Sequence, residues 1–143
     1  DSHISSDLPR PEDLTNLIGA VSDELEDITR DHPIVATAMR TVGVAGTIVT
    51  IAAVELGLHE FDDSALHGMS LSRDAAEDVF RTVATEPLAL RVQNPGLGPD
   101  RADIIVAGCC ILVATMRRLH LSEITVSTRG LLDAVASRVR LNS

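Results

Sequence analysis

Two short runs of β-branched residues, each followed at once by a helical pattern, constrain the fold of this chain more than any other feature. The runs predict strands at Thr41–Val44 and at Ile124–Val126. Consecutive strand–helix units normally place their strands side by side and parallel in one sheet. The predicted architecture is therefore a helix-rich α/β layer fold with a short parallel strand pair. Because two such strands do not form a stable sheet alone, we expect the sheet of this chain to be incomplete.

Apolar residues at helical spacing predict helices over most of the remaining chain. The predicted helices are Pro11 to the Asp31-His32-Pro33 break, Ile48–Leu56, a helix capped by Ser72 that ends near Val83, Leu88–Val92, a longest helix from Pro99 or Asp100 to Leu119, and Leu131–Val139. The longest helix is apolar on nearly all sides, so we expect it to be buried. In the last helix, Leu131, Leu132, Val135 and Val139 are expected to face inward. Residues 58–71 are expected to be irregular.

The charge balance limits the partners that the chain can have. It carries 12 basic and 21 acidic residues, a formal net charge of −9, which argues against a broad nucleic-acid surface. All of the basic residues are Arg, which is explained either by the codon bias of a GC-rich genome or by bidentate recognition of phosphate. A binding site for a polyanion would need a few of these Arg residues to converge, or a basic channel elsewhere.

Cysteine usage and hydropathy indicate the compartment. Cys109 and Cys110 are adjacent in an apolar run, and the chain has no other Cys for a framework disulfide. We therefore expect two buried, reduced thiols in a cytoplasmic protein. The longest apolar stretch, Ile104 to Met116, is too short to span a bilayer, and no signal peptide is recognised.

The segment Gly43-Val44-Ala45-Gly46-Thr47 carries the best local signal for a site. A strand that ends in a glycine turn and opens a helix points free backbone N–H groups at one spot, where the helix dipole also favours an anion. The Thr47 hydroxyl could add a donor. The alternative is a tight turn in which Gly serves only the backbone angles.

Several segments together are similar, in the same order, to the exopolyphosphatase/guanosine-pentaphosphatase (Ppx/GppA) family. They are Asp7 to Glu12, Gly43 to Ala52, His67-Gly68 followed by Leu71, Gly96-Leu97 through Pro99, Arg101-Ala102-Asp103, Gly108, and Val126-Ser127. The resemblance covers nearly the whole chain. It implies a partial ribonuclease-H-like domain of the actin/Hsp70/sugar-kinase superfamily, with residues 1–143 as the C-terminal part of domain II. The N-terminal domain and the first strands of domain II would be absent, and the resemblance implies that three of those strands flank Thr41–Val44.

The resemblance also implies an activity, the release of terminal phosphate from inorganic polyphosphate or guanosine pentaphosphate. Mg²⁺ would be bound mainly by the absent half, which would also hold the catalytic Glu. We therefore expect no catalytic residue in this chain and no activity of the chain by itself. Expected partners are the N-terminal domain of the same protein, the phosphate substrate and further copies in a homo-oligomer, with no nucleic acid and no membrane.

The residues that the resemblance places at the phosphate cleft are Gly43, Gly46, Thr47 and Ser127, with Arg101, Asp103 and His67 in support. Arg101 and Asp103 have a structural alternative, because an acid near a helix start favours the dipole and an Arg can bind loop carbonyls. His67 has no companion His or Cys at metal-ligand spacing, so no metal site is expected. Ser127 lacks the Gly-x-Ser-x-Gly context of a hydrolase nucleophile.

The chain departs from the family pattern at two places. Ala45 stands where a Gly is common, and Leu131-Leu132-Asp133-Ala134 replaces the usual Leu-Arg-Glu-Gly of the last helix. These departures put in doubt a ligand contact from that helix. They also leave open a second function, a non-catalytic module of the same fold that senses a nucleotide or phosphate.

Overall fold

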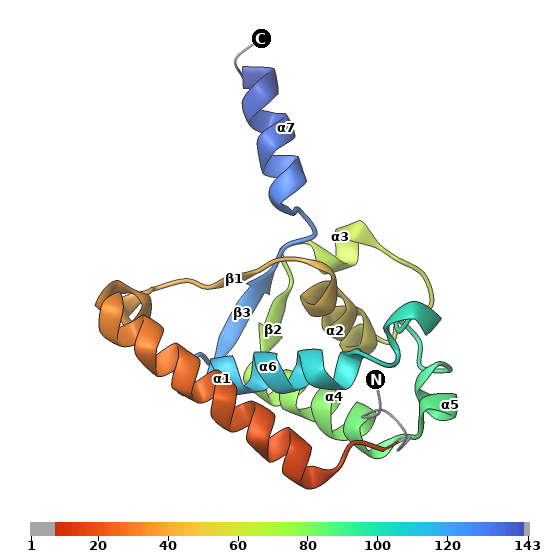
Figure 1. Cartoon of the computed structure of the whole chain (residues 1–143). Coiled ribbons are helices and arrows are strands. Elements are labelled where there is room, and N and C mark those ends of the chain that lie inside the picture. Colours follow the sequence, from red (N-terminus) through yellow and green to blue (C-terminus); the bar gives the residue numbers. More distant parts are fainter. Residues whose placement is uncertain (1–7, 142–143) are drawn as a thin grey trace.

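The computed structural model describes residues 8–141, without the side chains of Leu131, Leu132 and Ala134. Its elements are α1 (Pro11–Asp31), the 3₁₀ helix η1 (Pro33–Thr37), β1 (Val42–Gly43), α2 (Gly46–Leu56), α3 (Asp63–Leu66), β2 (Ser70–Ser72), α4 (Arg73–Thr85), α5 (Leu88–Arg91), the 3₁₀ helix η2 (Pro99–Arg101), α6 (Ile105–Arg118), β3 (Glu123–Val126) and α7 (Leu131–Leu141). Figure 1 shows helices packed against a small sheet, from which α7 projects.

The described residues form a sheet with the strand order β1-β3-β2. β1 and β3 are parallel, with Val42 opposite Thr125, which confirms the predicted strand pair. β2 pairs with β3 in the antiparallel direction, with Leu71 opposite Ile124. This strand lies where we expected irregular structure, because a single apolar residue between two serines gives too short an alternation to indicate a strand.

One face of the sheet forms the core of the molecule. Leu71, Ile124 and Val126 are buried there in one hydrophobic cluster with residues of α2, α4 and α6. The other face is largely polar and exposed, and on it Ser70 Oγ donates to Glu123 Oε2 at 2.7 Å. On β1, at the edge of the sheet, Val42 is 49% exposed. That further strands flank β1 stays a prediction.

The predicted helices occur in the predicted order, but α3 lies in the stretch that we expected to be irregular, and the longest helix differs. α1 has 21 residues and α6 has 14, since η2 and a tight turn precede Ile105. In that segment Ala102 N and Ile104 N bond to carbonyls three residues earlier, so the backbone is wound too tightly for an α-helix. α6 is buried as expected and lies between α4 and α1 (Figure 1).

The two cysteines lie in the core, as their position in the apolar run predicted. Both side chains are fully buried in α6. Burial raises the pKa of the Cys109 thiol to about 12 and also raises that of Cys110. Both groups are therefore held in the unreactive thiol form.

Helix α7 does not pack as its sequence predicted. Val135 is 53% exposed and Val139 is 61% exposed, so the expectation that they face inward is wrong. Leu131 and Leu132 belong to the same prediction, but their side chains lie outside the described part of the structure. The turn after β3 directs α7 away from the body (Figure 1), and an amphipathic pattern cannot specify that direction.

Candidate functional site

Two turns meet at the C-terminal ends of the parallel strands β1 and β3. The β1–α2 turn (Gly43–Thr47) and the β3–α7 turn (Ser127–Gly130) are joined directly, because Ser127 N donates to Gly43 O at 2.8 Å. Ligands of open α/β sheets bind outside the carboxyl ends of the strands. The structure therefore brings two of the predicted segments to the place where this fold presents a site.

The β1–α2 turn offers backbone donors to an anion. Ala45 is the N-cap of α2 and makes no side-chain capping bond, and the first bond into the helix is Val49 N to Ala45 O at 3.3 Å. Among the described residues, the N–H groups of Gly46, Thr47 and Ile48 meet no acceptor. These N–H groups stand at the positive end of the helix dipole, which favours an anion there.

Ala45 holds this turn in a strained conformation. Its φ of 78° and ψ of 170° lie in a region that essentially only Gly occupies. The sequence comparison expected a Gly at this position, and the backbone keeps the glycine geometry although the side chain has changed. Such strain persists only where the surrounding structure determines the backbone.

Arg101 places its guanidinium directly against the first residue of α2. A Cβ atom at Gly46 would lie 2.6 Å from Arg101 Cζ, so only Gly permits this approach. The Arg101 side chain is exposed and has no ion-pair partner within the described residues. Buried Arg91 holds the backbone directly after Arg101, because its Nη1 donates to Ala102 O at 2.9 Å. The turn thus combines free N–H groups with a free positive charge.

Gly43 and Thr47 fix the turn by packing. A Cβ atom at Gly43 would lie 2.8 Å from Ile48 Cδ1, so the missing side chain makes room for the core. The Thr47 methyl points at Gly108 of α6, where a Cβ atom would overlap it. Close packing, with no side-chain hydrogen bond among the described residues, therefore holds the first turn of α2 in place.

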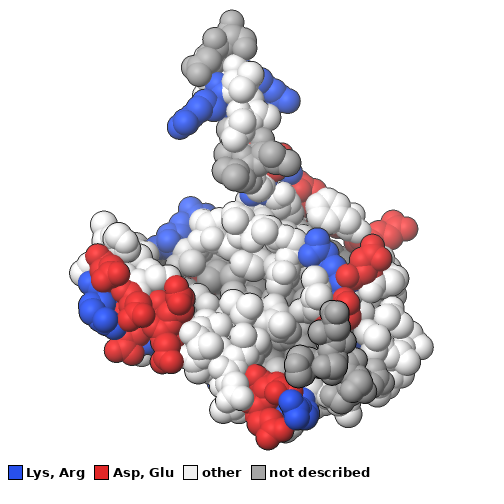
Figure 2. Space-filling model, in the orientation of Figure 1, with Lys and Arg blue, Asp and Glu red and all other residues white. Residues whose placement is uncertain are grey.

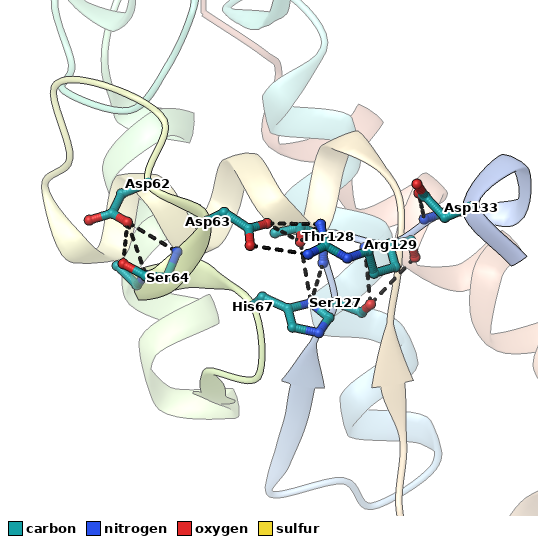
Figure 3. A network of polar contacts seen from close by, with 10 residues as sticks. Asp62, Asp63, Ser64, His67, Ser127, Thr128, Arg129 and Asp133 are labelled. Carbon is teal, nitrogen blue, oxygen red and sulfur yellow. Dashed lines mark hydrogen bonds and ion pairs between the residues drawn. The ribbon is translucent and has the colours of Figure 1, made fainter. Parts of the chain in front are cut away.

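The β3–α7 turn is held instead by polar side chains (Figure 3). Ser127 Oγ accepts from Arg129 N at 3.1 Å, and Thr128 N donates to His67 Nδ1 at 3.1 Å. Thr128 Oγ1 donates to Asp63 Oδ1 at 2.5 Å, and the Arg129 guanidinium contacts both Asp63 oxygens at 3.2 and 3.3 Å. The Thr128 hydroxyl, and then Arg129, lower the pKa of Asp63.

The predicted site residues therefore do not all meet. Contacts link Gly46 with Arg101 and Gly43 with Ser127, and His67 joins through Thr128. Thr47 lies in the same turn but packs against Gly108. Asp103 is exposed and makes no bond to the others within the part of the chain that the structure describes.

Sequence reasoning missed Asp63, Thr128 and Arg129. The Asp63–Arg129 pair joins residues 66 positions apart, so no local pattern could have indicated it.

The acidic side chains are unevenly distributed over the surface. Figure 2 shows acidic side chains gathered over the C-terminal half of α1, while the middle of the same face carries little charge. These acidic residues are Asp23, Glu24, Glu26, Asp27 and Asp31. No group of three or more His, Cys, Asp or Glu among the described residues could hold a metal ion, so we assign no metal ligand to them. Among the same residues, no helix is long and apolar enough to cross a membrane.

A family model and several solved structures resemble the whole chain. The model of the Ppx/GppA phosphatase family matches residues 1–141. Exopolyphosphatase 2 of Mycobacterium tuberculosis is 29% identical over 140 residues, which covers 93% of this chain and 43% of the relative. An exopolyphosphatase-like protein of known structure has a TM-score of 0.85 at 24% identity, over 97% of this chain and 47% of that one. The Aquifex aeolicus PPX-GPPA enzyme has a TM-score of 0.79 at 26% identity, over 92% and 42%.

These comparisons confirm the predicted fold class, a helix-rich, partial ribonuclease-H-like α/β fold with a parallel strand pair. The chain spans less than half the length of the relatives that it matches.

Proposed function

The chain belongs to the Ppx/GppA phosphatase family, and from this premise we propose that it is the substrate-binding, C-terminal part of an exopolyphosphatase-like phosphohydrolase. The substrate is inorganic polyphosphate or guanosine pentaphosphate, from which the whole enzyme releases the terminal phosphate. Residues 1–143 correspond to the C-terminal part of domain II, and the preceding domain and strands supply the rest. The name and length of the mycobacterial relative support this reading.

One observation carries the proposal, the pairing of the α2 N-terminus with the Arg101 guanidinium. The free N–H groups of Gly46, Thr47 and Ile48 and an unpaired guanidinium lie at one turn. A guanidinium binds a phosphate through two parallel N–H···O bonds, and backbone amides complete the set of donors. In this arrangement a few groups provide local positive potential on a chain whose formal net charge is −9.

The proposal divides the roles in the reaction between this chain and the rest of the enzyme. Gly46 lets Arg101 and the phosphate approach the backbone, and Thr47 sets the first turn of α2. His67 supports this site from outside through its bond with Thr128 N, whereas Asp103 makes no contact with it among the described residues. The general base and Mg²⁺ belong to the absent half, where the metal would neutralise charge on the transferred phosphate.

Titration of tripolyphosphate into the chain tests the proposed site. Arg101→Gln removes the guanidinium and should weaken binding about three- to tenfold, since it deletes a charge-assisted contact. Arg81→Gln is the matched control, because Arg81 is also an exposed Arg, lies on α4 and is paired with Asp78. Equal affinities of Arg101→Gln and the wild type would contradict the site. Guanosine pentaphosphate in a parallel titration shows which of the two substrates is preferred.

The activity of the isolated chain is a second test. With polyphosphate and Mg²⁺ the chain should release no phosphate above a heat-inactivated control, because the proposed general base belongs to the absent half. Adding the separately expressed N-terminal half should restore release. Binding without any release after this reconstitution would favour the alternative, a module of the same fold that senses phosphate or nucleotide.

We propose the edge of β1, which pairs with no further strand among the described residues, as the partner surface. Unpaired strand edges recruit other strands, and Val42 and Val44 are each 49% exposed there. We expect the N-terminal domain to cover this edge, and a homo-oligomer to form when that domain is missing. Sedimentation should show association of the wild type and less of it for Val42→Lys, while Val92→Lys, on another exposed Val, should change nothing.

A further inference from the structure

The β3–α7 turn contains a set of hydrogen-bond donors that bind a carboxylate of the chain itself. Thr128 Oγ1 and both terminal nitrogens of Arg129 converge on the two oxygens of Asp63 (Figure 3). The pair is accessible, since the Arg129 side chain is 57% exposed and that of Asp63 is 41% exposed. A fork of two guanidinium N–H groups with a hydroxyl beside it is also the arrangement that binds a phosphate.

This donor set lies next to the proposed phosphate site. Ser127, one residue before Thr128, donates its N–H to Gly43 O, so the set begins next to the β1–α2 turn. α3, which carries Asp63, packs against α2 as well. The two turns thus present neighbouring sets of hydrogen-bond donors at the C-terminal ends of the strands. The set at the β1–α2 turn is open, and the set at the β3–α7 turn is occupied by Asp63.

We propose that Thr128 and Arg129 form a second phosphate subsite, which a phosphate group of the substrate enters by displacing the Asp63 carboxylate. This rests on the proposed function, because the first subsite is the one at Gly46 and Arg101. Exposed ion pairs are weak, so the loss of the Asp63–Arg129 pair opposes binding only slightly. Two adjacent subsites make the chain selective for anions with several linked phosphates over orthophosphate.

Calorimetric titration of orthophosphate and tripolyphosphate into the 143-residue chain tests the second subsite. Arg129→Gln should weaken tripolyphosphate binding about tenfold and leave orthophosphate binding unchanged, whereas Arg101→Gln should weaken both. Arg129→Lys keeps the charge without the fork and should be intermediate. Circular dichroism of each variant shows that it is folded.

Asp63→Asn distinguishes a displaced carboxylate from a structural one. It removes the internal competitor and should strengthen tripolyphosphate binding about two- to fivefold, the equivalent of a weak surface pair. Asp62→Asn is the matched control, since it removes the same charge one residue away and Asn caps a helix as well as Asp. It should leave the affinity at the wild-type value.

The outcomes separate this proposal from the proposed function. Tripolyphosphate affinity that is unchanged in Arg129→Gln but reduced in Arg101→Gln would overturn the second subsite and leave the first intact. A loss in Asp63→Asn as large as that in Arg129→Gln would show that Asp63 orients the turn and is not displaced. Failure of the wild type to bind either anion would overturn both proposals.

Discussion

The β1–α2 turn and the β3–α7 turn follow the C-terminal ends of neighbouring strands, yet different forces hold them. Steric contact fixes the first, since the Thr47 methyl fits against Gly108 and the missing side chain of Gly43 makes room for Ile48. Hydrogen bonds and an ion pair fix the second, through Asp63 and His67. A turn held by packing keeps its donors free for a ligand. A turn held by polar side chains has used its donors already, so a ligand must compete for them.

A side chain at Gly108 should have the largest effect on stability, because it disrupts the packing that holds the β1–α2 turn. Gly108→Ala places a methyl group inside the contact with Thr47 and should lower the free energy of unfolding by about 2 kcal/mol, as overpacking does. Thr47→Ser removes the opposing methyl, so the double variant should regain most of the loss. Gly19→Ala is the control, since a Cβ atom at this helical Gly meets nothing within 4 Å. Chemical denaturation of the wild type and of each variant measures these changes.

Relieving the strain at Ala45 should have the opposite sign. Ala45→Gly puts the residue that tolerates φ = 78° into the β1–α2 turn. The strain is of order 1–3 kcal/mol, and the extra chain entropy of Gly opposes the gain by up to about 1 kcal/mol. We therefore expect a net stabilisation of about 1 kcal/mol, with a rise in melting temperature of roughly 3 °C. A loss of stability would mean that Ala45 is not strained.

Removing one hydroxyl should loosen the β3–α7 turn without disturbing the core. Thr128→Val keeps the shape of the side chain and deletes the bond to Asp63, so the free energy of unfolding should fall by about 1 kcal/mol. Thr128→Ser keeps the hydroxyl and should lie within a few tenths of a kcal/mol of the wild type. If both variants lose the same amount, the methyl and not the hydroxyl holds the turn.

The smallest effect is a dependence of stability on pH that belongs to the β3–α7 turn alone. The Thr128 hydroxyl, and then Arg129, lower the pKa of Asp63 in the folded chain below its unfolded value of about 4. Its contribution is therefore present above pH ~4 and is lost as the pH falls through the folded pKa. Unfolding curves between pH ~5 and ~2.5 should fall less steeply for Asp63→Asn than for the wild type. Arg101→Gln, at the other turn, should keep the wild-type slope.

The sequence by itself determined most of the secondary structure. Helix periodicity, Pro11 at a first turn and Ser72 as a cap are signals that depend on residues within a few positions of one another. The same holds for the parallel pair of β1 and β3, since each strand leads directly into a helix. The β1–α2 turn could also be proposed as a site, because its glycines and the helix start are adjacent in the chain.

Only the tertiary structure decided which side chains meet there. Arg101 comes to Gly46 from a distant segment, and Asp63 reaches Arg129 across 66 positions, so neither contact has a local signature. β2 forms because β3 offers Ser70–Ser72 a partner, and α7 points away from the body because of the turn before it. Local patterns reflect bonds between near neighbours, whereas contacts between distant segments depend on the path of the whole chain.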